Sequence, residues 1–197
     1  VAVCDVNREG GGYLSWNWAS GKDLRLAGRE PARRVVEDNY AKQKGTGKYK
    51  GCRAYADYRE LFENEDVDAV MVATPDHAHA MITMAALRRG KHVYCEKPMA
   101  YSIQEVRMIT EAARRAKVAT QLGNQGQASE EVRLVHEYIL DGAIGAVRDV
   151  HITVGAPFWE QSSWGARPPE NPPVPDGLDW DLWLGPAPER PYHPAYH

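Results

Sequence analysis

The sequence predicts an α/β protein whose core is a doubly wound parallel sheet, with strands and helices alternating along the chain. The first observation behind this prediction is a set of short apolar segments, such as residues 67–73, which suit strands covered on both faces. The second is that stretches with helical spacing of apolar residues, about ten to fifteen residues long, separate these segments. The third is that proline, glycine or a capping residue marks most changes from strand to helix.

The first element is a strand over residues 1–5, which ends on the carboxylate of Asp5. Residues 7–28 are rich in Gly, Ser and Trp, so we expect a loop insertion there. Residues 30–44 are predicted to be a helix, because Pro31 stands near the start, where a helix tolerates it, and glycines follow the end.

Four more strands complete the predicted sheet, at residues 52–55, 67–73, 92–95 and 118–122. The helices between them cover residues 58–64, residues 77–89 and a segment that Ser102 opens. Pro75 separates the second of these strands from its helix, and Gly90 ends that helix. Ser102 and Glu105 have the spacing of a capping box, which predicts a helix start at this point.

The pattern changes in the last third of the chain. Ser129 is predicted to cap a helix that runs to about Leu140. Apolar and polar residues then alternate over residues 150–154, as in a half-exposed antiparallel strand. Residues 168–175 are too rich in proline for regular structure, and residues 179–184 are expected to form a short aromatic turn.

These elements predict three parts along the chain. Residues 1–125 are a dinucleotide-binding domain, residues 126–142 a connecting helix, and residues 143–197 the start of a substrate or dimerisation domain. We expect the first strand of the sheet to precede Val1 and the rest of the second domain to follow His197, so that both domains are incomplete here.

Composition excludes several classes of function. With 26% charged residues and a net charge of -3, the basic residues are interspersed with acidic ones, which argues against a nucleic-acid partner. The longest apolar runs are strand-sized and argue against a membrane partner. Cys4, Cys52 and Cys95 lie far apart without a C-x-x-C pair, which favours neither zinc nor disulfides and fits a reducing compartment. We expect a cytoplasmic protein, with export left open because a leader could precede Val1.

The end of the first strand carries a candidate cofactor ligand. In open parallel sheets, ligands bind beyond the carboxyl ends of the strands, and a carboxylate such as Asp5 accepts hydrogen bonds from the adenosine ribose. Such a carboxylate repels the extra phosphate of NADP, whereas Arg8 could pair with it, so NADP stays open beside NAD. A solvated or helix-capping aspartate explains Asp5 equally well.

Polar residues also follow the strand at residues 67–73. Thr74, Pro75 and Asp76 break this strand and place backbone N–H groups and small polar side chains beside a bound cofactor. His77 and His79 form an H-x-H pair without a nearby carboxylate and cysteine set. This pattern favours packing or hydrogen bonding over a metal site, and we expect no metal.

The Glu96-Lys97-Pro98 segment is the strongest chemical signal in the sequence. A lysine held at a strand end inside a cleft loses hydration and suits proton transfer or the orientation of a substrate hydroxyl. Glu96 could hold the lysine or bind a ribose, although an exposed ion pair between neighbours explains a Glu-Lys pair as well. Asn124 and Gln125, after the last strand, offer amide groups to a nicotinamide or a substrate, and a simple turn explains them equally.

In this order, Asp5, Ala73–His79 and Gly90–Pro98 resemble the Gfo/Idh/MocA oxidoreductases, and the resemblance covers about residues 1–155. It implies a Rossmann domain followed by an α+β domain with a large, mostly antiparallel sheet, and NAD or NADP bound between them. By this likeness Lys97 is the catalytic lysine, often placed by a cis bond to the next proline. The residues implied in cofactor binding are Asp5, Thr74, Pro75, His79 and Glu96.

Residues 177–194 resemble a bacterial branch of this family that acts on carbohydrates. We therefore expect hydride transfer between NAD(P) and a sugar or polyol, with Lys97 assisting the hydroxyl proton. Two alternatives stay open: an NAD-dependent glycoside hydrolase that oxidises its sugar transiently, and a non-catalytic sugar-binding or assembly protein on the same fold. The family's glycine-rich turn and its downstream Asp and His motif are not in this sequence, so we expect these residues alone to be inactive. Because the open sheet face of this family commonly forms dimers, we expect the complete protein to form homo-oligomers.

Overall fold

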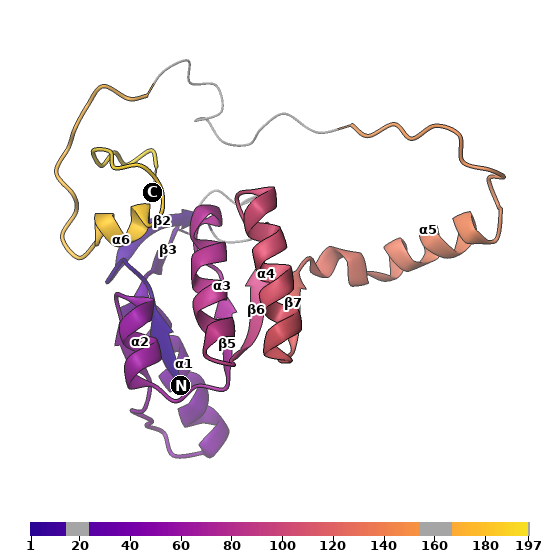
Figure 1. Ribbon diagram of the computed structural model, residues 1–197. Helices are drawn as coiled ribbons and strands as arrows, with labels where there is room; N and C mark the ends of the chain where they lie inside the picture. Colours follow the sequence, from indigo (N-terminus) through magenta and orange to yellow (C-terminus); the bar gives the residue numbers. More distant parts are fainter. Residues whose placement is uncertain (15–23, 154–166, 197) are drawn as a thin grey trace.

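The computed structural model describes residues 1–14, 24–153 and 167–196. Its parallel strands form two groups, with the helices packed beside them (Figure 1). The first group pairs β1 (Ala2–Cys4) with β4 (Arg53–Tyr55), and the second has the order β5 (Ala69–Val72), β6 (His92–Glu96), β7 (Thr120–Gly123). The predicted parallel α/β architecture is thus confirmed, in two hydrogen-bonded groups rather than one continuous sheet over the described residues.

The helices follow from local signals in the sequence. The described helices in the first two thirds of the chain are α1 (Arg29–Lys44), α2 (Tyr58–Asn64), α3 (His79–Arg88) and α4 (Ile103–Ala116). Ser102 and Glu105 form both hydrogen bonds of the predicted capping box at the start of α4. Gly45 ends α1 in the left-handed conformation, with a φ of 64°. No described helix is long and apolar enough to cross a lipid bilayer.

The main hydrophobic core lies between α3, α4 and the three-stranded group. Its buried members include Val72 on β5, Leu87 on α3, Val93 on β6 and Ile109 on α4. Figure 1 shows α3 and α4 side by side over this group, while α1 and α2 pack on β1 and β4. This core holds β5, β6 and β7 in register, so that their carboxyl ends form one edge.

Two sequence-based predictions of local structure are wrong. Within the expected loop insertion, β2 (Gly10–Leu14) and β3 (Leu24–Ala27) form an antiparallel pair, because the pairing of the two strands outweighs the low strand propensity of glycine. Residues 150–153 form no strand, and Ile152 is 80% exposed. Alternation alone does not make a strand: among the described residues no neighbouring strand pairs with this segment. Val154 lies outside the described residues.

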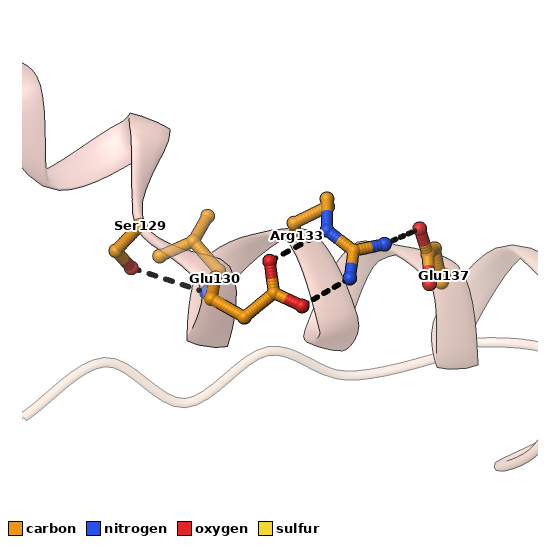
Figure 2. Close-up of polar contacts among 5 residues, drawn as sticks. Ser129, Glu130, Arg133 and Glu137 are labelled. Atoms are coloured by element: carbon orange, nitrogen blue, oxygen red, sulfur yellow. Dashed lines mark hydrogen bonds and ion pairs between the residues drawn. The ribbon is translucent and has the colours of Figure 1, made fainter.

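Helix α5 (Glu130–Leu140) starts at Ser129, as predicted, and extends away from the rest of the chain (Figure 1). Its own side chains support it: the Val132 N–H donates to Ser129 Oγ at 3.3 Å, and Arg133 pairs with both Glu130 and Glu137 (Figure 2). Its exposed large apolar side chains are Val135, Tyr138, Ile139 and Leu140.

The last described segment returns to the beginning of the chain. Residues 167–175 have no regular structure, as their prolines predict, and α6 (Trp180–Leu184) forms the expected aromatic turn. Leu178 makes a β-bridge to Asn7, and the Asp179 N–H donates to the Val6 carbonyl at 3.0 Å. A segment that the sequence assigns to the second domain therefore packs on the end of β1, while the domain boundary near residue 143 stays a prediction.

The three cysteines are free and their thiols are expected to be unreactive. Burial raises the pKa of Cys4 to about 12, with the Asp5 charge adding to the effect, and burial also raises the pKa of Cys52 and Cys95. The thiolate is the reactive form, so a raised pKa leaves little of it at pH 8. We expect iodoacetamide at pH 8 to label the denatured chain at three thiols within minutes and the native chain hardly at all, as measured by intact mass. A native thiol labelled as fast as in urea would contradict this expectation.

Candidate functional site

The carboxyl ends of β5, β6 and β7 form one edge that collects most of the predicted site residues. The register pairs Val72 with Cys95 and Glu96 with Gly123, so the three strands end at the same level. Thr74 lies two residues after the end of β5, and Lys97 and Asn124 directly follow β6 and β7 at this edge. The structure thus brings together side chains that lie up to fifty residues apart in the sequence.

Lys97 lies at the carboxyl end of the three-stranded group. It directly follows the central strand β6, its side chain is exposed, and its bond to Pro98 is cis, as the family resemblance implies. Among the described residues, no hydrogen bond or ion pair engages its ammonium group, not even with the adjacent Glu96. The amine is therefore available to a molecule that binds at this edge.

The Glu96 side chain lies against β7, where glycine makes room for it. A Cβ atom added at Gly123 would come within 2.5 Å of Glu96 Oε2 and 2.9 Å of the Glu96 Cα atom. Any larger residue at position 123 would have to displace this carboxylate. The half-buried Glu96 is thus placed beside Lys97 with its carboxylate directed along the strand ends.

The end of β5 carries a buried polar atom without a partner. Thr74 Oγ1 is buried and makes no hydrogen bond within the described ranges, and Pro75 and Asp76 beside it are exposed. Pro75 precedes the short 3-10 helix η2 (Asp76–Ala78), which leads into α3. A buried hydroxyl costs free energy unless it is hydrogen-bonded, so this atom fits a site in which a bound molecule supplies the partner.

His79 differs from the other predicted cofactor residues because it is 1% exposed. Its Nδ1 lies 2.5 Å from the Pro98 carbonyl oxygen and its Nε2 lies 2.7 Å from the Thr74 carbonyl oxygen. Both ring nitrogens are thus engaged with backbone. His79 joins the segment after β5 to the segment after Lys97, and any effect on a cofactor would pass through those segments.

The turn after β1 forms the second part of the site. Asp5 Oδ1 accepts the Asn7 N–H at 2.8 Å, and the Asp5 carbonyl accepts Arg29 Nη1 at 3.0 Å. The first N–H groups of α1 donate to the carbonyls of Asn7 and Arg8, both at 3.0 Å. Asp5 therefore stands in a turn that helix α1 holds, and the Arg8 side chain is exposed beside it.

Sequence reasoning missed the segment that joins these two parts. The Arg8 N–H donates to the Gly177 carbonyl at 2.8 Å, and His77 Nε2 donates to the Trp183 carbonyl at 2.8 Å. Trp183 also meets the His77 ring edge-on, with ring centroids 5.2 Å apart. The segment Gly177–Leu184 thus contacts both the turn after β1 and η2. The signal was present in its closely spaced tryptophans, whose apolar area needs a packing surface.

The residues present fit a nicotinamide dinucleotide. The carboxylates of Asp5 and Glu96 match ribose hydroxyls, and Thr74 offers a buried hydroxyl. Asn124 and Gln125 are exposed at the start of the 3-10 helix η3 (Gln125–Ala128), and their role stays a prediction. Within the described part of the chain, no group of three or more His, Cys, Asp or Glu is arranged to hold a metal ion.

Two protein-family models match the chain. One is described as an oxidoreductase family with an NAD-binding Rossmann fold and matches residues 21–124. The other is described as an oxidoreductase family's C-terminal alpha/beta domain and matches residues 128–197. Together these matches cover most of the chain, including the ends of β5, β6 and β7.

Several known proteins are similar to parts of the chain. Levoglucosan dehydrogenase of Pseudarthrobacter phenanthrenivorans is 34% identical over 47% of this chain and 24% of its own length. The 1,5-anhydro-D-fructose reductase of Ensifer adhaerens is 34% identical over 66% of this chain and 38% of its own. The crystal structure of the WlbA dehydrogenase from Bordetella pertussis in complex with NADH and UDP-GlcNAcA shares the fold, with a TM-score of 0.50 and 21% identity over 72% of this chain and 32% of that one. The chain thus spans well under half the length of these relatives.

Proposed function

Because the chain belongs to the Gfo/Idh/MocA oxidoreductase family, we propose that the protein transfers a hydride between a nicotinamide dinucleotide and a hydroxyl-bearing carbon of a sugar or polyol. The observation that carries the proposal is the position of Lys97 at the end of β6, exposed and flanked by the ends of β5 and β7. The names of the similar dehydrogenase and reductase support a substrate of the sugar class.

Each residue of the edge takes a distinct part in this proposal. The bound dinucleotide supplies the hydride chemistry, and the Lys97 amine takes or returns the proton of the substrate hydroxyl. The Asp5 and Glu96 carboxylates accept hydrogen bonds from ribose hydroxyls, and Thr74 Oγ1 donates to the cofactor. Pro75, Asp76, Asn124 and Gln125 are proposed to line the same edge, and a second protomer is proposed to complete a homo-oligomer.

The preferred cofactor in this proposal is NAD. The Asp5 carboxylate repels a 2'-phosphate, whereas the neighbouring exposed Arg8 would favour one. The turn geometry supports the repulsion by Asp5, because the hydrogen bond from the Asn7 N–H and helix α1 hold Asp5 in place. The Arg8 side chain, by contrast, has to order itself before it pairs with a phosphate.

The activity is tested on the complete protein with NAD and a panel of sugars, inositols and glycosides, by absorbance of NADH and by product analysis. Consumption of NAD equal to the oxidised sugar formed is the expected result. Release of an aglycone without net NAD consumption would instead indicate a glycoside hydrolase. Absence of NADH binding by fluorescence titration would overturn both readings and leave a binding or assembly protein.

Asp5→Ala is expected to weaken NADH binding by about 10- to 100-fold, because hydrogen bonds to a charged group contribute roughly 1.5–3 kcal/mol. NADPH binding should weaken less, since the same change removes a repulsive charge. Fluorescence titrations with both nucleotides measure the two dissociation constants. Asp38→Ala, on the exposed surface of α1, is the matched control. An equal loss for both nucleotides would place the Asp5 carboxylate away from the ribose.

A further inference from the structure

We propose that His79 is a clamp that holds the Lys97 loop against the end of β5, and that it is a positioning residue for Lys97. The clamp is seen in the contacts of the chain itself, while its importance for catalysis rests on the function proposed above. Both ring nitrogens lie within hydrogen-bond distance of a backbone carbonyl, at 2.5 Å from Pro98 and 2.7 Å from Thr74.

The two partners of the ring come from two different segments. The Thr74 carbonyl lies after β5, and the Pro98 carbonyl lies after Lys97 at the end of β6. The imidazole ring therefore bridges these segments, with one ring nitrogen facing each carbonyl oxygen.

The burial of His79 makes this arrangement specific. At 1% exposure the ring has almost no contact with solvent, so its polar nitrogens depend on protein partners. Its helix neighbours Ala78 and Ala80 are buried and apolar. The two backbone carbonyls therefore take the place of the water that would surround an exposed ring.

The clamp fixes the backbone on the far side of Lys97. On the near side, Glu96 is paired with Gly123 in the sheet. On the far side, the Pro98 carbonyl bonds to His79, which is anchored in turn at Thr74. Lys97 thus stands between two fixed points, while its side chain stays exposed. If one of these two contacts is lost, the Lys97 amine is no longer held in position. A misplacement of about 1 Å can lower the rate roughly 100-fold.

The clamp is tested by NMR of the complete protein ¹⁵N-labelled at its histidines. We expect a histidine ring N–H proton that exchanges slowly with solvent, because the ring is buried and bonded to backbone carbonyls. This signal should disappear in His79→Gln and remain in His136→Gln, a change on the exposed surface of α5. Should His79→Gln not fold, the spectrum of the unmodified protein still decides. Fast exchange of every histidine ring N–H would overturn the clamp.

The positioning role is tested by kinetics of the same variants. A glutamine side chain has one amide group in place of the two ring nitrogens, so it does not reproduce both contacts of the ring. His79→Gln should lower kcat at least tenfold and weaken NADH binding by a smaller factor, because the proposed ribose contact of Asp5 follows a separate pair of strands. Unchanged kcat in a folded His79→Gln protein would overturn the role. Failure of the proposed function is distinct: the unmodified protein would then oxidise no sugar, whatever its NMR spectrum shows.

Discussion

Lys97→Ala in the complete protein is expected to lower kcat by about 10²- to 10⁴-fold, the range that a positioned acid or base contributes. The reason is geometric: Lys97 follows the central strand of the three-stranded group, and its amine forms no ion pair with another described side chain. The NADH dissociation constant should change little, because the proposed ribose contacts come from Asp5 and Glu96. Steady-state kinetics and a fluorescence titration separate the two effects.

Lys91→Ala is the matched control for this experiment. Lys91 precedes the same strand at the opposite edge and pairs with Asp66 at 3.4 Å. Its loss should leave kcat within about twofold, since an ion pair to the exposed Asp66 contributes roughly 0–1 kcal/mol to stability and lies far from Lys97 along β6. Normal turnover in Lys97→Ala, or an equal loss in both variants, would remove Lys97 from the chemistry.

Gly28→Ala is expected to lower the free energy of unfolding by about 2–5 kcal/mol, combining backbone strain with overpacking. Gly28 has a φ of 110° and a ψ of 173°, a conformation that side chains other than glycine avoid. An added Cβ would lie 2.8 Å from the Asn7 carbonyl oxygen and 2.9 Å from that of Arg8. These are the carbonyls that accept the first N–H groups of α1, so the turn that holds Asp5 should loosen as well.

Urea unfolding followed by circular dichroism measures the loss of unfolding free energy in Gly28→Ala, and NADH titration measures the effect on the turn that holds Asp5. Gly45→Ala is the control, because Gly45 has a φ of 64° but nothing within 4 Å of an added Cβ. It should cost only about 1–2 kcal/mol, the strain of a left-handed residue without a clash. If Gly28→Ala is no more destabilising than Gly45→Ala, the contact between the turn and α1 is not tight.

A segment late in the chain connects the two parts of the site. Gly177–Leu184 bonds to the turn after β1 and to His77, so a segment late in the chain helps to place residues early in it. Trp180 and Trp183 stack with centroids 4.6 Å apart, and the Trp180 Nε1–H donates to the Arg190 carbonyl. This small aromatic core anchors the segment on the nucleotide-binding part of the chain.

The sequence by itself determined the elements that depend on local chemistry. Apolar runs predicted the parallel strands, and the capping box of Ser102 and Glu105 predicted the start of α4. The position of Lys97 directly after an apolar strand predicted its place at the sheet edge, because parallel strands end together. Each of these signals lies within a few residues of the feature that it predicts.

Only the tertiary structure decided which distant segments meet. The return of Gly177–Leu184 to the turn after Asp5 depends on partners far away in the sequence. The pairing of β2 with β3 and the absence of a strand at residues 150–153 depend on which segments have a neighbouring strand in the folded chain. The same holds for His79, whose spacing indicates a helix start but not two carbonyl partners. Contacts between residues far apart in the sequence leave no periodic pattern around either residue, so they can be identified only from the folded structure.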